Sequence, residues 1–220
     1  MRRSRQLAAI VVLLAGILAT LGIVGLALAH RAAPASPPSG LTWFTGTRWQ
    51  PEPKVSWETN FTLPDQNRHL ISLRRLRGKV VLLSFTSSVC KSQCPLVGRE
   101  LSLSERFLGS LAKRTVIVNV SVEPETDTRR TVYHFAREVG WLPYRWHYVW
   151  ASRKKMKPIW AAYYVYVQAP PRSAKANQDV KHLAAMAMID PEGRIRGYFA
   201  YPFLPHQIAA GVKHLLAEPS

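Results

Sequence analysis

The apolar run Val80-Val81-Leu82-Leu83-Ser84-Phe85 is followed closely by Cys90-Lys91-Ser92-Gln93-Cys94-Pro95 and then by a helical pattern. A strand end that leads into a helix start exposes its side chains at the carboxyl edge of an α/β sheet. These two cysteines are the only ones among 220 residues. The stretch therefore predicts both the class of fold and the place where its chemistry lies.

The spacing of the two cysteines permits two chemistries. In a helix, residues four apart share one face with Cβ atoms about 5–6 Å apart, which is wider than the ~3.5–4.5 Å of a relaxed disulfide. Two thiolates on one face converge on a metal ion at bond lengths near ~2.3 Å, whereas a local loop would let them close into a disulfide. The spacing leaves both open and slightly favours a metal.

The alternative of two unrelated core cysteines follows from the frequent burial of free cysteine. The position of Cys90 and Cys94 argues against it, because the amides of a helix N-terminus favour thiolate. Lys91 adds a nearby positive charge. We interpret the pair as reactive thiols.

The N-terminal segment 1–31 is predicted to be a membrane anchor or an export signal. Leu7–Ala29 contains no charged residue and is long enough to cross a ~30 Å hydrocarbon core. Ala27-Leu28-Ala29 has the form of a signal-peptidase site, but the apolar run exceeds the roughly 7–15 residues of a cleaved signal. An uncleaved single-pass anchor is therefore favoured over cleavage after Ala29, and the arginines before it place the N-terminus in the cytoplasm.

The remainder of the chain divides into a tether and one domain. Residues 32–56 are rich in proline and small residues, as in an extended linker, and residues 57–220 are long enough for one domain with its own core. Two cysteines on the outer side of a cell membrane cannot form a disulfide scaffold. They are either one redox pair or a metal site.

Strand and helix patterns alternate along the domain. Expected strands are 61–65, 70–73, 80–85 and 115–122, with helices at about 95–111, from Thr128 through Val139, around Met156–Tyr163 and near the C-terminus. Strands 183–189 and 195–200 flank the turn Asp190-Pro191-Glu192-Gly193. This order predicts an α/β thioredoxin-like fold with a mostly parallel central sheet, helices on both faces and a late antiparallel hairpin.

The chain resembles the Sco/SenC family of membrane-tethered copper-binding proteins that assemble cytochrome c oxidase. The resemblance runs from Phe61 to Leu215 and is carried by these motifs: Phe61-Thr62-Leu63-Pro64-Asp65, Leu76-Arg77-Gly78-Lys79-Val80-Val81-Leu82, Cys90-x3-Cys94-Pro95, Ser121-Val122-Glu123-Pro124-x2-Asp127-Thr128, Lys157-Pro158-Ile159-Trp160 before Tyr163-Tyr164-Val165-Tyr166, and Asp179-x2-His182 before Ile189-Asp190-Pro191-Glu192-Gly193. The cysteine pair together with the late Asp-x2-His is the most specific part.

The resemblance implies a copper site formed by Cys90, Cys94 and His182. Asp179 is a candidate acceptor that would orient the imidazole, with an ordinary surface aspartate as the equal alternative. Two thiolates and an imidazole suit copper as Cu(I) or Cu(II), although zinc accepts the same ligands. It further implies a metallochaperone rather than an enzyme, with cytochrome c oxidase subunit II or a similar copper acceptor as its partner. Lys91 stands where the family commonly has proline, and Ser87-Ser88-Val89 replaces an aromatic residue and a threonine.

Two methionines and the other histidines are left out of the predicted site. Met186 and Met188 alternate with the expected strand and are interpreted as core residues. His134 and His214 fall on exposed helix faces, and His147 lies in an aromatic run.

The composition is strongly basic, with a formal net charge of +17. In an exported protein this makes a nucleic-acid partner improbable and favours an acidic protein or anionic lipid head groups, with a solvated basic surface as the plain alternative. The competing functional hypothesis is an exported thiol:disulfide oxidoreductase using Cys90 and Cys94. Thioredoxin-type enzymes, however, have two intervening residues between their cysteines.

Overall fold

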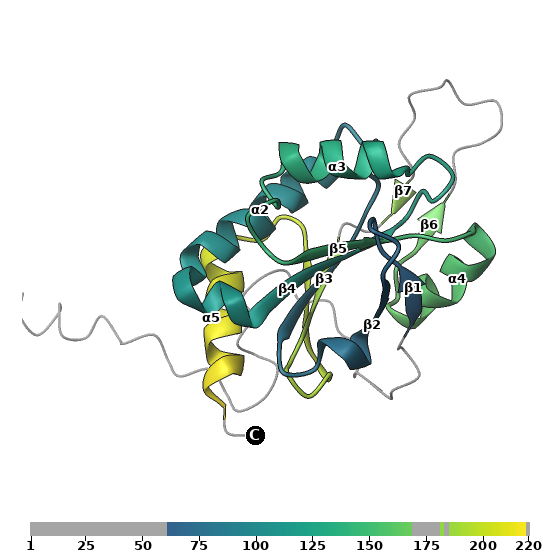
Figure 1. Ribbon diagram of the computed structural model, residues 1–220. Helices are drawn as coiled ribbons and strands as arrows, with labels where there is room; N and C mark the ends of the chain where they lie inside the picture. Colours follow the sequence, from purple (N-terminus) through teal and green to yellow (C-terminus); the bar gives the residue numbers. More distant parts are fainter. Residues whose placement is uncertain (1–60, 169–180, 183–184, 219–220) are drawn as a thin grey trace, which may run out of the picture. The chain divides into compact units, whose positions relative to one another are not determined.

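A five-stranded sheet organises the domain in the computed structural model, which describes residues 61–168, 181–182 and 185–218. The elements follow one another in this order (Figure 1): β1 (Thr62–Pro64), β2 (Leu70–Ser72), η3 (Leu73–Leu76), β3 (Val80–Thr86), α2 (Gln93–Leu108), η4 (Gly109–Arg114), β4 (Thr115–Ser121), α3 (Arg129–Glu138), β5 (Trp146–Val149), α4 (Arg153–Ala162), β6 (Val167–Gln168), β7 (Lys181–His182), β8 (Ala185–Ile189), β9 (Ile195–Ala200) and α5 (Pro205–Ala217).

The strand order of this sheet is β5-β4-β3-β8-β9. β3 pairs in parallel with β4, and β4 in parallel with β5, whereas β8 and β9 form the antiparallel hairpin beside β3. The predicted thioredoxin-like α/β fold with a late hairpin is confirmed. Its parallel part consists of three strands.

Alternation along β3 divides the core into two layers. Val80 and Leu82 pack on one face of the sheet with residues of α2, α3 and α5, whereas Val81 and Leu83 pack on the other face with α4, η3 and the β1–β2 hairpin. Successive side chains of a strand point to opposite faces. Both faces of the sheet are therefore covered, as Figure 1 shows.

Local sequence explains where the two helices α2 and α3 begin. α2 begins at Gln93, so Pro95 is its third residue, where a missing N–H costs no intrahelical bond. α3 begins after Thr128, whose hydroxyl accepts from the backbone N–H of Thr131, while the Thr131 hydroxyl accepts from the backbone N–H of Thr128. This capping box fixes where α3 starts.

Close approach holds α3 against α2. A Cβ added at Gly98 would lie 2.8 Å from Val139, so only glycine fits there. The indole N–H of Trp141 donates to the Gly98 carbonyl at 2.9 Å, and Arg99 pairs with Glu138 at 3.2 Å.

Several boundaries differ from the sequence prediction. α2 starts two residues earlier than expected and ends at Leu108, and the short helix η4 replaces its predicted last turn. β5 lies within the aromatic run that carried no strand prediction, and the two-residue strands β6 and β7 were also not predicted. The hairpin β8–β9 and the C-terminal helix α5 lie where the sequence placed them.

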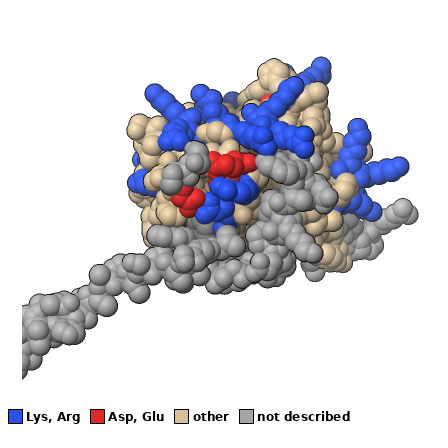
Figure 2. Space-filling view, turned by 90° about the horizontal axis from the view of Figure 1, so that it is seen from below, with Lys and Arg blue, Asp and Glu red and all other residues tan. Residues whose placement is uncertain are grey.

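Three predicted features lie outside the described residues: the anchor Leu7–Ala29, the tether 32–56 and Asp179. Within the part of the chain that the structure describes, no helix is long and apolar enough to cross a membrane. Lys and Arg make up most of the charged side chains on the face that Figure 2 shows.

A buried acid predicts how stability changes with pH. Glu105 is 1% exposed, and burial raises its pKa from 4.5 to about 7 although the Thr115 hydroxyl donates to it. Ionising this buried acid costs folding free energy. The cost is absent below pH 4.5, grows between pH 4.5 and about 7, and is complete above that range. Glu105→Gln should therefore raise the free energy of unfolding at pH 8 by up to about 3 kcal/mol and change it little at pH 5.

Urea unfolding at the two pH values measures this difference. Glu138→Gln is the matched control, because Glu138 lies at the surface beside Arg99 and exposed pairs contribute little. An equal effect of Glu105→Gln at pH 5 and pH 8 would contradict the assignment.

Candidate metal centre

The two cysteines lie at the carboxyl end of β3. Cys90 is in the bend between β3 and α2, and Cys94 is the second residue of α2. Both are nearly buried, at 7% and 1% exposure, and they are not joined by a disulfide. The sequence left helix and loop open for this segment, and the structure places only Cys94 in the helix.

Contacts bring the thiols and the predicted histidine together. The side chains of Cys90 and Cys94 form a hydrogen bond, and Cys94 Sγ lies 3.7 Å from His182 Nε2. His182 is half-buried on β7, where it pairs with Val167 of β6. The small β6–β7 sheet therefore presents the imidazole to the N-terminus of α2.

The distance between Cys94 and His182 suits two ligands of one ion. With metal–sulfur and metal–nitrogen bonds of about 2.3 and 2.0 Å, two ligands at a trigonal angle are about 3.7 Å apart. Among the described residues, no three His, Cys, Asp or Glu side chains form a ready-made metal site. The three candidate ligands thus meet as two pairs, Cys90 with Cys94 and Cys94 with His182.

The surroundings of Cys90 favour its thiolate. The hydrogen bond from Cys94 is the largest of several effects that together lower the pKa of Cys90 from 9.0 to about 6, against the opposing effect of burial. The Ser92 hydroxyl, 3.6 Å from Cys90 Sγ, and the backbone N–H groups of Ser92 and Cys94 act in the same direction. Cys90 is therefore largely ionised at neutral pH.

A buried carboxylate holds the segment that leads to Cys90. Asp127 Oδ1 accepts from the Ser88 N–H at 2.9 Å and lies 2.5 Å from the Ser88 hydroxyl. Its Oδ2 accepts from Ser121 at 2.5 Å and from Tyr148 at 2.9 Å. Asp127 thus ties the thiol segment to the ends of β4 and β5.

Burial also shifts the titration of this cluster. It raises the pKa of Asp127, although the hydrogen bonds from Ser121, Ser88 and Tyr148 oppose the shift. The pKa of the fully buried Tyr148 hydroxyl is raised well above its usual value by burial and by the neighbouring Asp127, with a further contribution from Cys94. The cluster is therefore electrostatically linked to the thiols.

Sequence reasoning did not assign a role to this cluster. Asp127 was part of a motif of the resemblance, which was the available signal, but nothing in the sequence pointed to Tyr148 or Ser88 as its donors. Of the other residues weighed, Met186 and Met188 are fully buried in the core beside β3, and His147 bonds to Asp65 at 2.9 Å. The structure does not describe Asp179.

These observations define a class of protein: a thioredoxin-fold domain with a Cys-x3-Cys pair at the start of α2 and a histidine from the short strand β7 beside it. The sequence model of the SCO1/SenC family matches residues 50–217. The chain belongs to the SCO1/SenC family.

Individual relatives are distant in sequence and similar in fold. The human mitochondrial SCO1 homolog is 23% identical over 145 residues, 61% of this chain and 44% of the human protein, so the match spans less than half of that relative. The copper-bound structure of ScoI from Bradyrhizobium japonicum is 25% identical, with a TM-score of 0.62 over 71% of this chain and 98% of that one. BsSco, described with a disulfide switch as a member of the Sco family of cytochrome c oxidase assembly proteins, is 19% identical, with a TM-score of 0.58 over 78% of this chain and 100% of that one.

The titration of Cys90 is open to direct measurement. The rate of iodoacetamide alkylation at Cys90, followed by peptide mass spectrometry, should rise with a midpoint near pH 6. Cys94→Ala should move the midpoint upward toward 9.0, because the variant loses the hydrogen bond that contributes most to the low pKa. Cys94→Ser, which keeps a donor, should shift it less. An unchanged midpoint in Cys94→Ala would show that Cys94 does not lower the pKa of Cys90.

The role of Asp127 predicts a loss of stability and of order around the thiols. Asp127→Ala should lower the free energy of unfolding by about 2 kcal/mol or more, since the Ser88 N–H and the Ser121 hydroxyl would lose their acceptor, whereas the Tyr148 hydroxyl would keep its bond to the Thr86 carbonyl. It should also speed the alkylation of Cys90. Asp127→Asn keeps an acceptor for the Ser88 N–H and should recover most of both properties. If Asp127→Ala had the same free energy of unfolding and the same rate of Cys90 alkylation as the wild type, this role of Asp127 would be refuted.

Proposed function

We propose that this protein binds copper at Cys90, Cys94 and His182 and delivers it to, or maintains the cysteines of, the dinuclear copper centre of cytochrome c oxidase. The observation that carries the proposal is the 3.7 Å contact between Cys94 Sγ and His182 Nε2 beside the hydrogen-bonded Cys90. Membership of the SCO1/SenC family and the copper bound in ScoI of Bradyrhizobium japonicum support it.

The chemistry of the ligands supports copper as the cargo. Two thiolates hold soft Cu(I), and an imidazole makes the set acceptable to Cu(II). The low pKa of Cys90 means that little proton release is needed before it can act as a ligand at neutral pH. Its position beside a helix N-terminus further stabilises negative charge on sulfur.

The proposed setting is the outer side of a membrane. Leu7–Ala29 would anchor the chain, residues 32–56 would form the tether, and residues 57–220 would form the copper-binding domain. Cytochrome c oxidase subunit II or a similar copper acceptor is the proposed partner. Asp179 would orient the His182 imidazole by accepting its second N–H.

A second candidate function is thiol:disulfide exchange, favoured by the lowered pKa of Cys90. Cys90 thiolate would attack a partner's disulfide and release one partner thiolate, and Cys94 would then attack the mixed disulfide and release the other. The partner is reduced to two thiols, and Cys90 and Cys94 become a disulfide. The disulfide switch described for BsSco makes this chemistry relevant.

His182 distinguishes the two candidates. His182→Ala should spare much of the Cu(I) affinity, since two thiolates suffice for that ion, but should weaken Cu(II) binding at least tenfold and remove most of the thiolate-to-Cu(II) charge-transfer band. The measurement is a titration of the reduced full chain in detergent with each oxidation state, beside an assay of exchange with a disulfide-containing peptide.

His206→Ala is the matched control, because His206 is exposed at the start of α5. It should leave both copper titrations unchanged. If His182→Ala kept the band at full intensity, the histidine would not be a ligand. If the wild type bound no copper but exchanged disulfides rapidly, the second candidate would replace the first.

A further inference from the structure

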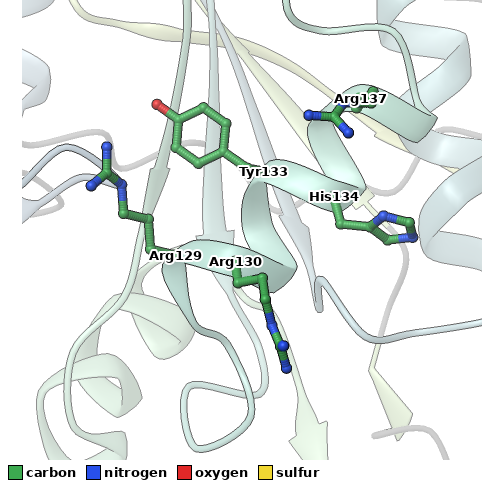
Figure 3. A pocket seen from close by; sticks show the side chains of 5 residues that line it. All are labelled: Arg129, Arg130, Tyr133, His134 and Arg137. Atoms are coloured by element: carbon green, nitrogen blue, oxygen red, sulfur yellow. The ribbon is translucent and has the colours of Figure 1, made fainter.

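The outer face of α3 forms a basic surface that we name the arginine face. Its residues follow helical spacing, so they share one side of the helix, whereas Val132, Phe135 and Ala136 are buried on the other side. Figure 3 shows the five side chains projecting from α3. They line an open hollow of about 770 Å³: Arg129, Arg130, Tyr133, His134 and Arg137.

The arginines of this face have no acidic partner among the described residues. Elsewhere, arginines such as Arg153 and Arg196 are held by carboxylates at 2.7 and 2.6 Å. Arg130 and Arg137 are exposed, so their charges are available to a carboxylate from another molecule.

Two contacts order part of the arginine face. The Tyr133 hydroxyl donates to Asn67 at 2.8 Å, and the guanidinium of Arg129 lies over the Tyr133 ring at 5.6 Å. A side chain that is already ordered loses less conformational entropy on binding. The face is therefore prepared for a partner of defined shape.

The first turn of α3 adjoins the segment that carries the thiols. Thr131 Oγ1 lies 2.7 Å from the Ser88 hydroxyl, and Asp127, two residues before α3, accepts from the Ser88 backbone N–H. Ser88 is two residues from Cys90. A protein bound to the arginine face would thus lie beside the segment that leads to the thiols.

We propose that the arginine face is the docking surface for an acidic protein that exchanges metal or electrons with the thiol site. Complementary charge brings partners together quickly and fixes their orientation. Cys90 and Cys94 are almost buried, so a partner's ligands reach them only if the partner is held closely and in register. The identity of the partner as a copper acceptor rests on the proposed function, but the docking surface does not.

A protein fits these observations better than a lipid surface. Attraction to anionic lipid requires only positive charge at the surface, and groups of basic side chains also lie on the face of the molecule in Figure 2. The fixed tyrosine and the position next to the Ser88 segment are features that a lipid surface would not use.

The test compares two double charge reversals in the full chain in detergent. Arg130→Glu/Arg137→Glu changes the arginine face, and Lys113→Glu/Arg114→Glu changes two exposed residues of η4, which directly precedes the amino end of β4. Both variants alter the net charge equally. Three probes are used at fixed ionic strength: the soluble domain of cytochrome c oxidase subunit II, a fluorescent poly-L-glutamate and phosphatidylglycerol vesicles.

The arginine-face variant should bind poly-L-glutamate and the subunit II domain about tenfold more weakly, and the η4 variant less than about twofold more weakly. Both variants should keep the copper stoichiometry and the urea unfolding midpoint of the wild type. A second result is that the arginine-face variant loses poly-L-glutamate binding while the wild type does not bind the subunit II domain. This would support the arginine face as a docking surface for an acidic protein and exclude subunit II as that protein.

Two results would overturn the proposal. Equal weakening by both variants would mean that only bulk charge matters, and a selective loss of vesicle binding with poly-L-glutamate unaffected would assign the face to a membrane. Absence of copper binding by the wild type would count against the proposed function alone, because binding of the acidic probes is measured without metal.

Discussion

The carboxylate of Asp127 is the constraint on which the site depends. It receives hydrogen bonds from Ser88, Ser121 and Tyr148, and these residues come from the thiol segment, the end of β4 and β5. A carboxylate offers several acceptor lone pairs, so three surrounding donors suit it, and its removal would leave the Ser88 N–H and the Ser121 hydroxyl without this acceptor. One buried side chain therefore fixes the position of the thiol segment relative to the sheet.

Local patterns were sufficient to predict most of the fold. β3 is recognisable from its apolar run, because burial on both faces of a parallel strand leaves a continuous apolar signature. α2 is recognisable from the helical period that follows Cys94. β5 escaped prediction because it is short and combines Trp146, His147 and Tyr148. It is held by pairing with β4 and by Gln66, whose side chain accepts from the Tyr148 N–H.

The candidate site was predictable to a smaller degree. The cysteines were apparent from their spacing, and His182 entered only through a family resemblance, because the two-residue strands β6 and β7 have no local signature. The donors to Asp127 lie 39 and 21 residues away at Ser88 and Tyr148. Only the folded chain brings such distant polar groups together, so no pattern in the sequence marks them.

Cys94 connects the two chemistries that the site permits. Its sulfur contacts Cys90 on one side and His182 on the other, so a disulfide to Cys90 consumes the thiolate that a metal ion would share with the imidazole. Metal binding at these residues would require both sulfurs to be reduced. The histidine is carried by a small two-stranded sheet, which has little stability of its own, whereas Cys94 is fixed in α2. Exchange between the two states would therefore demand little of the sheet or of Asp127 and would involve mainly Cys90, the imidazole and the short strands that present it.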